Sequence, residues 1–267
     1  MNKLATLTIL LASLTGLIGC GKNLNPDKNA DSARTQYIKD SPTPYVVVDE
    51  DRTKAVDELI LSRRKLLALE GKLIAPAQED LDQYAGLLKE SSTGLARVFP
   101  RDSGNERRPL LVNGEGAYYQ FIGRTNEYGQ GSDLEYSTMN SPQFSVGFAG
   151  VDFGFLAQVG KIDIRQVNDK DPIVSYALAY PSPNGQSESY WRAEQTKWSN
   201  GIARGAVTFK NRTEAIVGMT YVIRSINENG YEVVVIFQVV RRDSTDGSVI
   251  LAWKLLKQFD KPVLNRN

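Results

Sequence analysis

The residue types that support the commonest enzyme chemistry are scarce in this chain. It has a single cysteine, Cys20, and no histidine among its 267 residues. A Ser-His-Asp triad, a Cys-His nucleophile and an ordinary zinc site all need imidazole or thiolate groups, so these classes of site are excluded. What remains is carboxylate chemistry, Ser-Lys chemistry, calcium held by oxygen ligands, and binding without catalysis. Because no glycine-rich phosphate loop and no EF-hand spacing is found, no cofactor and no metal are expected.

Cys20 closes a segment that resembles the signal of bacterial lipoprotein precursors. Lys3 gives it a charged start, residues 4–14 form an apolar run, and the small residue Gly19 comes directly before the cysteine. The run is too short for a permanent membrane span. The resemblance implies cleavage before Cys20, a diacylglycerol (for example palmitate-containing) on its thiol, and acylation of the new amino terminus, which together anchor a protein stably. Since Gly21 follows rather than Asp, the resemblance favours the outer membrane of the cell envelope if the cell is Gram-negative.

An alternative interpretation of this segment is an ordinary secretory signal, or an N-terminal anchor, in which the cysteine is incidental.

An aromatic group is the most distinctive candidate for a binding surface. Tyr190, Trp191 and Trp198 lie in a segment, 188–198, that is expected to form a short helix. A spacing of seven places both tryptophans on nearly the same side of a helix. Exposed rings of this kind can stack on the faces of sugars, so the three residues form a possible ligand platform. The alternative is that the tryptophans simply cap the core of the β domain.

Carboxylates close to this group raise the question of catalysis. Glu188 and Glu194 lie on either side of Arg192, and a glycosidase needs a carboxylate pair. However, a helical spacing of six does not put both acids on one face, so no catalytic residue is assigned.

Two further features have a structural and a functional interpretation. Arg224 is a lone charge in an apolar strand, where it must be paired if it is buried, unless it lies at the rim of the sheet. Asn126, Glu127 and Asp133 lie in a glycine- and tyrosine-rich stretch and could offer oxygen ligands to Ca²⁺. Their spacing matches no known calcium loop, and a plain hairpin loop is the alternative.

The composition indicates a globular protein with no preference for polyanions such as DNA. Hydrophobic residues make up 41% and charged residues 24%, while 32 basic side chains nearly balance 31 acidic ones. A chain so balanced has no bulk electrostatic reason to bind nucleic acid.

The N-terminal part divides into three expected segments: a signal peptide (1–19), a polar disordered tether (20–48) and a helical hairpin (49–104). The first helix is expected to end at Gly71 and the second to run from about Pro76 to Ser91, with Gly94 after it. The hairpin is expected to pack on the next domain or on a partner. The apolar stripe of its first helix consists of Val56, Leu59, Ile60, Arg63, Leu66 and Leu67.

The remainder, 105–267, is expected to be a β-rich domain. Residues 219–226 and 231–242 are rich in β-branched and aromatic side chains and flank Asn229-Gly230, which favours a two-residue type I′ turn. A turn at Asp246-Gly247 leads into a further strand at 249–257. Shorter strands are expected at 110–112, 117–122, 144–148, 175–180 and 206–210.

Pairing around Asn229-Gly230 makes both faces of this hairpin apolar, which predicts that it lies inside a sandwich or beneath helices. One face would carry Val222, Arg224, Ile226, Val233, Val235 and Phe237, and the other Tyr221, Ile223, Val234 and Ile236.

The sequence therefore predicts an α+β protein: an N-terminal helical hairpin followed by a mostly antiparallel β domain, sandwich or barrel-like. Its expected function is that of a non-enzymatic, membrane-anchored bacterial envelope lipoprotein, held by its lipid and with an envelope protein or glycan as partner. The alternative is a carbohydrate-binding or carboxylate-based glycan-active module at the envelope.

Overall fold

A computed structural model describes residues 49–101, 116–126, 128, 131–228 and 230–266. The chain divides into two units, Met1–Glu58 and Leu59–Asn267. Cys20, the tether, the expected strand at 110–112 and the candidate ligand Glu127 lie outside the described residues. No helix in the described part of the chain is long and apolar enough to cross a membrane.

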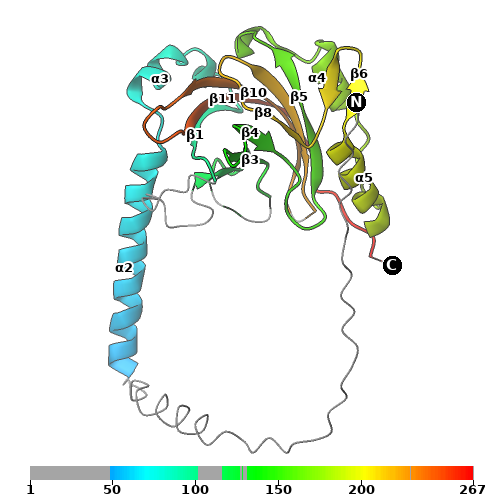
Figure 1. Cartoon of the computed structure of the whole chain (residues 1–267). Helices are drawn as coiled ribbons and strands as arrows, with labels where there is room; N and C mark the ends of the chain where they lie inside the picture. Colours follow the sequence, from blue (N-terminus) through cyan, green and yellow to red (C-terminus); the bar gives the residue numbers. More distant parts are fainter. Residues whose placement is uncertain (1–48, 102–115, 127, 129–130, 229, 267) are drawn as a thin grey trace, which may run out of the picture. The chain divides into compact units, whose positions relative to one another are not determined.

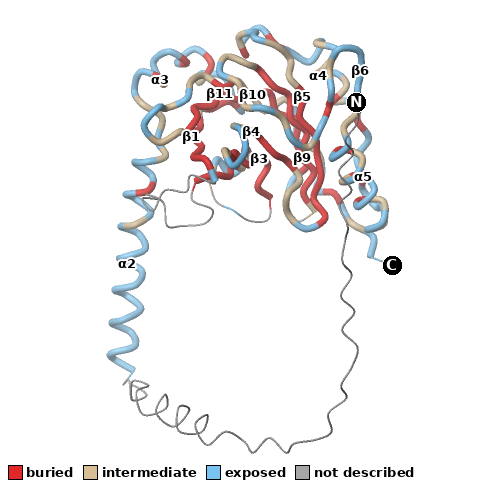
Figure 2. Tube along the Cα trace, viewed as in Figure 1, coloured by how far each residue is buried: buried red, intermediate tan, exposed pale blue. Residues whose placement is uncertain are grey.

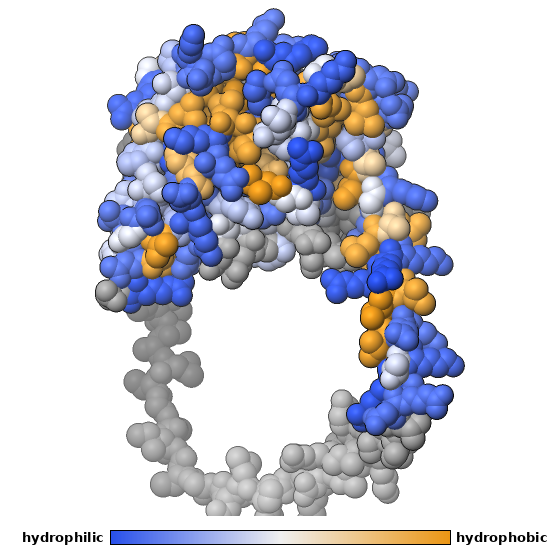
Figure 3. All heavy atoms as spheres, turned by 180° about the vertical axis from the view of Figure 1, so that it is seen from behind, coloured by the Kyte–Doolittle hydropathy of each residue, from blue (hydrophilic) through white to orange (hydrophobic). Residues whose placement is uncertain are grey.

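The first described element is the long helix α2 (Asp49–Ile74), which opens on three acidic residues that suit the positive end of its dipole. Figures 2 and 3 show that α2 is exposed along most of its length and that apolar side chains gather on it. Leu59 is 69% exposed and Leu67 is 41% exposed. The expected apolar stripe is therefore largely uncovered rather than packed on the next domain.

The second helix of the expected hairpin is much shorter than the sequence suggested. Only α3 (Gln78–Gln83) and the 3₁₀ turn η1 (Leu87–Lys89) form there. The strand β1 (Thr93–Val98) follows and pairs with β11 (Val249–Phe259), so the β domain begins before residue 105. Gly94 does not end a helix: it lies in β1, where a Cβ would come within 2.5 Å of the Trp253 ring.

Two antiparallel sheets form the domain (Figure 1). The larger has the order β1-β11-β10-β9-β5 and includes β5 (Phe153–Gly160), β9 (Thr220–Ile226) and β10 (Glu232–Arg242). The smaller has the order β2-β3-β4-β8, formed by β2 (Tyr118–Tyr119), β3 (Leu134–Ser137), β4 (Gln143–Ser145) and β8 (Arg212–Glu214). A separate two-stranded ribbon joins β6 (Ile202–Arg204) to β7 (Val207–Phe209).

Hydrophobic cores lie on both faces of the larger sheet, as the apolar strands predict. One core, which includes Phe144, Phe237 and Trp253, fills the space between the two sheets. The other joins the sheet to helices α4 (Pro172–Ala179) and α5 (Glu188–Asn200) and to the 3₁₀ turn η3 (Ile164–Gln166). The predicted α+β class, a helical start followed by an antiparallel sandwich, is confirmed, and here helices also cover the outer face of the larger sheet.

The prediction of a strand at 175–180 is wrong, because residues 175–179 belong to helix α4. Asp171 caps this helix by accepting a hydrogen bond from the backbone N–H of Ile173 (2.9 Å), and Pro172 occupies its first turn. Such N-terminal signals stabilise a helix locally and here override the β-like apolar composition.

The predicted pairing of β9 with β10 is also wrong by one residue. Ile226 lies opposite Glu232, so the connection spans five residues, 227–231, rather than a two-residue turn. Asn229 itself lies outside the described residues. Because side chains alternate along a strand, this slip exchanges the cross-strand partners. Val222, Ile226, Val234 and Ile236 face the helices, whereas Tyr221, Ile223, Val233, Val235 and Phe237 face the smaller sheet.

Candidate functional site

A polar groove beside β8 has a volume of about 630 Å³. A second hollow of about 350 Å³ shares three of its lining residues, Lys210, Arg212 and Thr213. We call the two together the Lys210–Arg212 groove. Hydroxyl, amide and cationic side chains dominate its lining, which also includes Ser141, Gln143, Gln158, Ser199, Thr208 and Asn211.

Lys210 is held in place by the end of α5 and by β5. Its backbone N–H donates to the Leu156 carbonyl (3.0 Å), and its own carbonyl accepts from the Leu156 N–H (2.6 Å). The aliphatic stem of Lys210 runs over Gly201, the residue that ends α5 with a φ of +84°. A Cβ on Gly201 would lie 2.5 Å from the Lys210 Cγ, so this glycine leaves room for the lysine to reach the groove.

Arg212 starts β8, the edge strand of the smaller sheet. Its Nε donates to the Ser145 hydroxyl (3.3 Å) on β4. Asn211 joins the two cationic residues, and its N–H donates to the Trp198 carbonyl (2.9 Å). Backbone contacts to β4, β5 and α5 thus set the positions of both cations.

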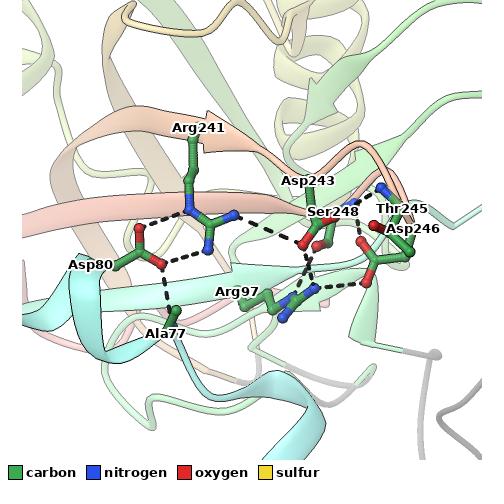
Figure 4. A network of polar contacts seen from close by, with 8 residues as sticks. All are labelled: Ala77, Asp80, Arg97, Arg241, Asp243, Thr245, Asp246 and Ser248. Carbon is green, nitrogen blue, oxygen red and sulfur yellow. Dashed lines mark hydrogen bonds and ion pairs between the residues drawn. The ribbon is translucent and has the colours of Figure 1, made fainter.

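Neither cation has a carboxylate within ion-pair distance, so far as the described residues extend. Two arginines elsewhere in the domain are neutralised: Arg241 pairs with Asp80 (2.7 Å), and Arg97 bridges Asp243 (3.0 Å) and Asp246 (2.7 Å), as Figure 4 shows. The Arg241–Asp80 bond also ties α3 to the larger sheet. Because no described carboxylate neutralises them, Lys210 and Arg212 are available to a negatively charged ligand.

The groove has the chemistry of a binding site. Cationic, hydroxyl and amide groups donate hydrogen bonds to anions and to sugar hydroxyls. Glu214 is the one carboxylate among the described lining residues, whereas carboxylate-based glycoside hydrolysis requires two. Nothing in the sequence singles out Lys210 or Arg212, because neither belongs to a motif and the groove forms only where several elements of the fold meet.

The expected platform of Tyr190, Trp191 and Trp198 is wrong. Both tryptophans are fully buried and Tyr190 is partly buried. The Trp191 ring packs edge-on against Phe153 (5.3 Å between centroids), and the Trp198 ring lies 4.2 Å from that of Phe155. The helical alignment of the two tryptophans was right, but this face of α5 points into the core, where it cannot stack on a sugar.

The carboxylates near these tryptophans have separate structural partners. Glu188 forms an exposed ion pair with Arg192 (3.2 Å). Glu194 is buried, accepts a hydrogen bond from the Tyr180 hydroxyl and pairs with Lys197 (2.9 Å). Burial, and then the neighbouring Glu194 carboxylate, raise the pKa of Tyr180. These groups form no acid pair of the kind that a glycosidase needs.

Arg224 is fully buried on the face of the larger sheet that α4 covers. It pairs with the equally buried Glu232 and donates to the Ala177 carbonyl (2.7 Å) at the end of α4. Its guanidinium also lies over the Phe259 ring (4.1 Å). Burial lowers the pKa of Arg224, and the Glu232 carboxylate opposes this shift. The expected structural pairing of this arginine is present.

Of the candidate calcium ligands, the two among the described residues, Asn126 and Asp133, are each bonded to other protein groups. Asn126 donates to the carbonyls of Arg97 (2.8 Å) and Gly116 (3.3 Å). Asp133 is buried and accepts from the Phe121 N–H (2.9 Å) and the Asn227 amide (3.0 Å). Across the described ranges, no group of three or more acidic, histidine or cysteine residues could hold a metal ion.

Two buried acids flank the β9–β10 connection. Burial raises the pKa of Asp133 to about 7. It also raises the pKa of Asp152 to about 6, although Asp152 accepts a hydrogen bond from the Glu228 N–H (2.8 Å). Nothing in the sequence indicates that Asp152 is buried, because this residue follows a turn and precedes a strand of ordinary pattern.

No family model matches this chain, and neither a curated protein nor a solved structure shows significant similarity to it. Its function must therefore be argued from the site itself.

Proposed function

We propose that this chain is a lipid-anchored lipoprotein of the bacterial cell envelope whose β domain binds an anionic, hydroxyl-rich polymer without catalysing a reaction. Such a polymer carries carboxylate or phosphate groups on a sugar or polyol backbone. The signal-like residues 1–19 directly before Cys20 support the lipid anchor. Gly21 after the cysteine supports a location in the outer membrane if the cell is Gram-negative.

The observation that carries the binding role is the Lys210–Arg212 groove. Two cations without carboxylate partners among the described residues lie in a hollow lined by hydroxyl and amide groups. Charged groups bind the anionic units of the polymer, while the neutral polar groups bind its hydroxyls.

Titration calorimetry of residues 21–267 with matched oligosaccharides tests this role. One oligosaccharide carries uronic acid or phosphate groups, and the other is its neutral analogue. We expect the anionic chain to bind more tightly, with an affinity that falls as salt is added. Lys210→Gln and Arg212→Gln should each weaken binding about fivefold, which corresponds to ~1 kcal/mol for a solvent-accessible charge contact.

Lys161→Gln is the matched control, because Lys161 is an exposed lysine outside the groove lining. Equal binding of the neutral and anionic chains, or an equal loss in the control variant, would refute the proposed role of the groove.

A further inference from the structure

A seven-residue pattern runs along α2. Leucines recur at Leu59, Leu66 and Leu73, and a second row of small or apolar residues, Ala55, Ser62 and Leu69, alternates with them. Alternating steps of four and three residues are the spacing of a coiled-coil seam. Every member of this seam is exposed except Leu66, which is partly buried. The seam is thus open to another helix.

The charges that flank the seam are arranged in two halves. The row of Leu59, Leu66 and Leu73 extends back to Arg52, and the residues just before these four positions are, in chain order, Asp51, Glu58, Lys65 and Lys72. All four side chains are exposed. Two acids followed by two bases complement the same helix when it runs in the opposite direction. In antiparallel coiled coils, side chains at this flanking position face each other across the seam.

We propose that α2 pairs with α2 of a second copy of this chain as an antiparallel two-helix coiled coil. Residues whose numbers add up to 121 then share a layer of the seam, so Leu59 packs on Ser62 of the second copy and Leu66 on Ala55. In the same register, Glu58 faces Lys65 of the second copy and Asp51 faces Lys72. Symmetry makes each contact twice.

Other occupants fit α2 less well. A parallel pair would place Arg52 beside Arg52 and would oppose Lys65 to Glu70, which is buried within its own chain. A membrane surface favours a helix with an excess of basic residues on its polar face, but α2 has six acidic and six basic side chains. A second copy is the occupant that the order of these charges complements.

Sedimentation equilibrium of residues 21–267 tests the proposal, because this polypeptide keeps every described residue. We expect a monomer–dimer equilibrium over roughly a hundredfold range of concentration. Leu59→Asp should abolish the dimer. Leu61→Asp is the matched control: Leu61 is 63% exposed, close to the 69% of Leu59, but lies outside the seam. It should leave the dimer intact.

Charge reversal tests the orientation of the helices. Glu58→Lys and Lys65→Glu should each weaken the dimer at least about tenfold, because each turns two attractive contacts into repulsive ones. The double variant, Glu58→Lys with Lys65→Glu, should restore dimerisation in an antiparallel pair. In a parallel pair the double variant would place the new lysine beside Arg63 and the new glutamate beside Glu70, so dimerisation would not be restored.

Circular dichroism of each variant checks that the helix is retained. A monomer at every concentration, an equal loss in Leu61→Asp, or no recovery in the double variant would overturn the proposal. Binding of the monomer to anionic phospholipid vesicles, with no dimer in solution, would do the same and would assign the seam to a membrane surface.

Discussion

Asp133 should make the stability of the domain depend on pH in the neutral range, and Asp133→Asn should remove much of that dependence. Asp133 is 1% exposed, and burial raises the pKa of its carboxyl group from 3.8 to about 7. In the unfolded chain the group returns to its ordinary pKa. Between these two values the folded state holds a proton that the unfolded state has lost, so the free energy of unfolding falls as the pH rises.

The size of this effect follows from the shift. About three pKa units at ~1.4 kcal/mol each correspond to roughly 4 kcal/mol in the free energy of unfolding. This contribution is fully present below pH 4 and is lost above pH 7. Between pH 5 and 8 the loss should be about 3 kcal/mol. Asp152 adds to it in the same direction, because its pKa is also raised, to about 6. Asp80, Asp163 and Asp243 have lowered pKa values and titrate below this window.

Asparagine at position 133 can keep most of the local hydrogen bonds. Its oxygen can accept from the Phe121 N–H, and its amide can donate to Asn227 if the Asn227 side chain turns over. In the native protein the buried side-chain oxygen of Asn227 has no hydrogen-bond partner. After the Asn227 amide rotates, its nitrogen takes the position of this oxygen and becomes the buried group without a partner. An unsatisfied buried donor costs about 1 kcal/mol or more. We therefore expect Asp133→Asn to be more stable than the native chain by roughly 2–3 kcal/mol at pH 8.

Urea unfolding at pH 5, 6, 7 and 8 measures both effects in parallel samples. The native chain should lose stability steadily across this series, and Asp133→Asn should lose much less. Asp152→Asn serves as the comparison, since it should flatten mainly the lower part of the curve. A variant that is less stable than the native chain at pH 8, or that keeps the native pH slope, would refute the reasoning.

Two further predictions concern α5 and the anchor. Trp198→Ala should lower the free energy of unfolding by about 3–5 kcal/mol, because it leaves a cavity beside Phe155. Thermal unfolding measures the change, and a melting temperature lowered by less than a degree would contradict the burial of this ring. Cys20→Ser should abolish lipidation and remove the protein from the membrane fraction, which fractionation with labelled palmitate can detect, and label retained by the variant would disprove the anchor.

Local signals in the sequence determined many of the elements. The β-branched runs at 219–226, 231–242 and 249–257 correspond to β9, β10 and β11, because such side chains fit a pleated surface and these strands are apolar on both sides. The helix expected around Trp191 is α5, with Ser187 as its cap and Gly201 at its end. The α+β class and the sandwich follow from these elements.

Only the tertiary structure decided how the elements face one another. Periodicity shows that Trp191 and Trp198 share a side of α5, but only packing on Phe153 and Phe155 decides that this side is buried. The connection at 227–231 sets a register that the Asn-Gly pair did not predict. This slip of one residue exchanged the β9 partners of residues 232–238 in β10. The Lys210–Arg212 groove has no sequence signature, because residues brought together by long-range pairing of β4, β5, β8 and α5 create it. Local propensity acts over a few residues, whereas the direction of a face and the lining of a groove depend on contacts between distant parts of the chain.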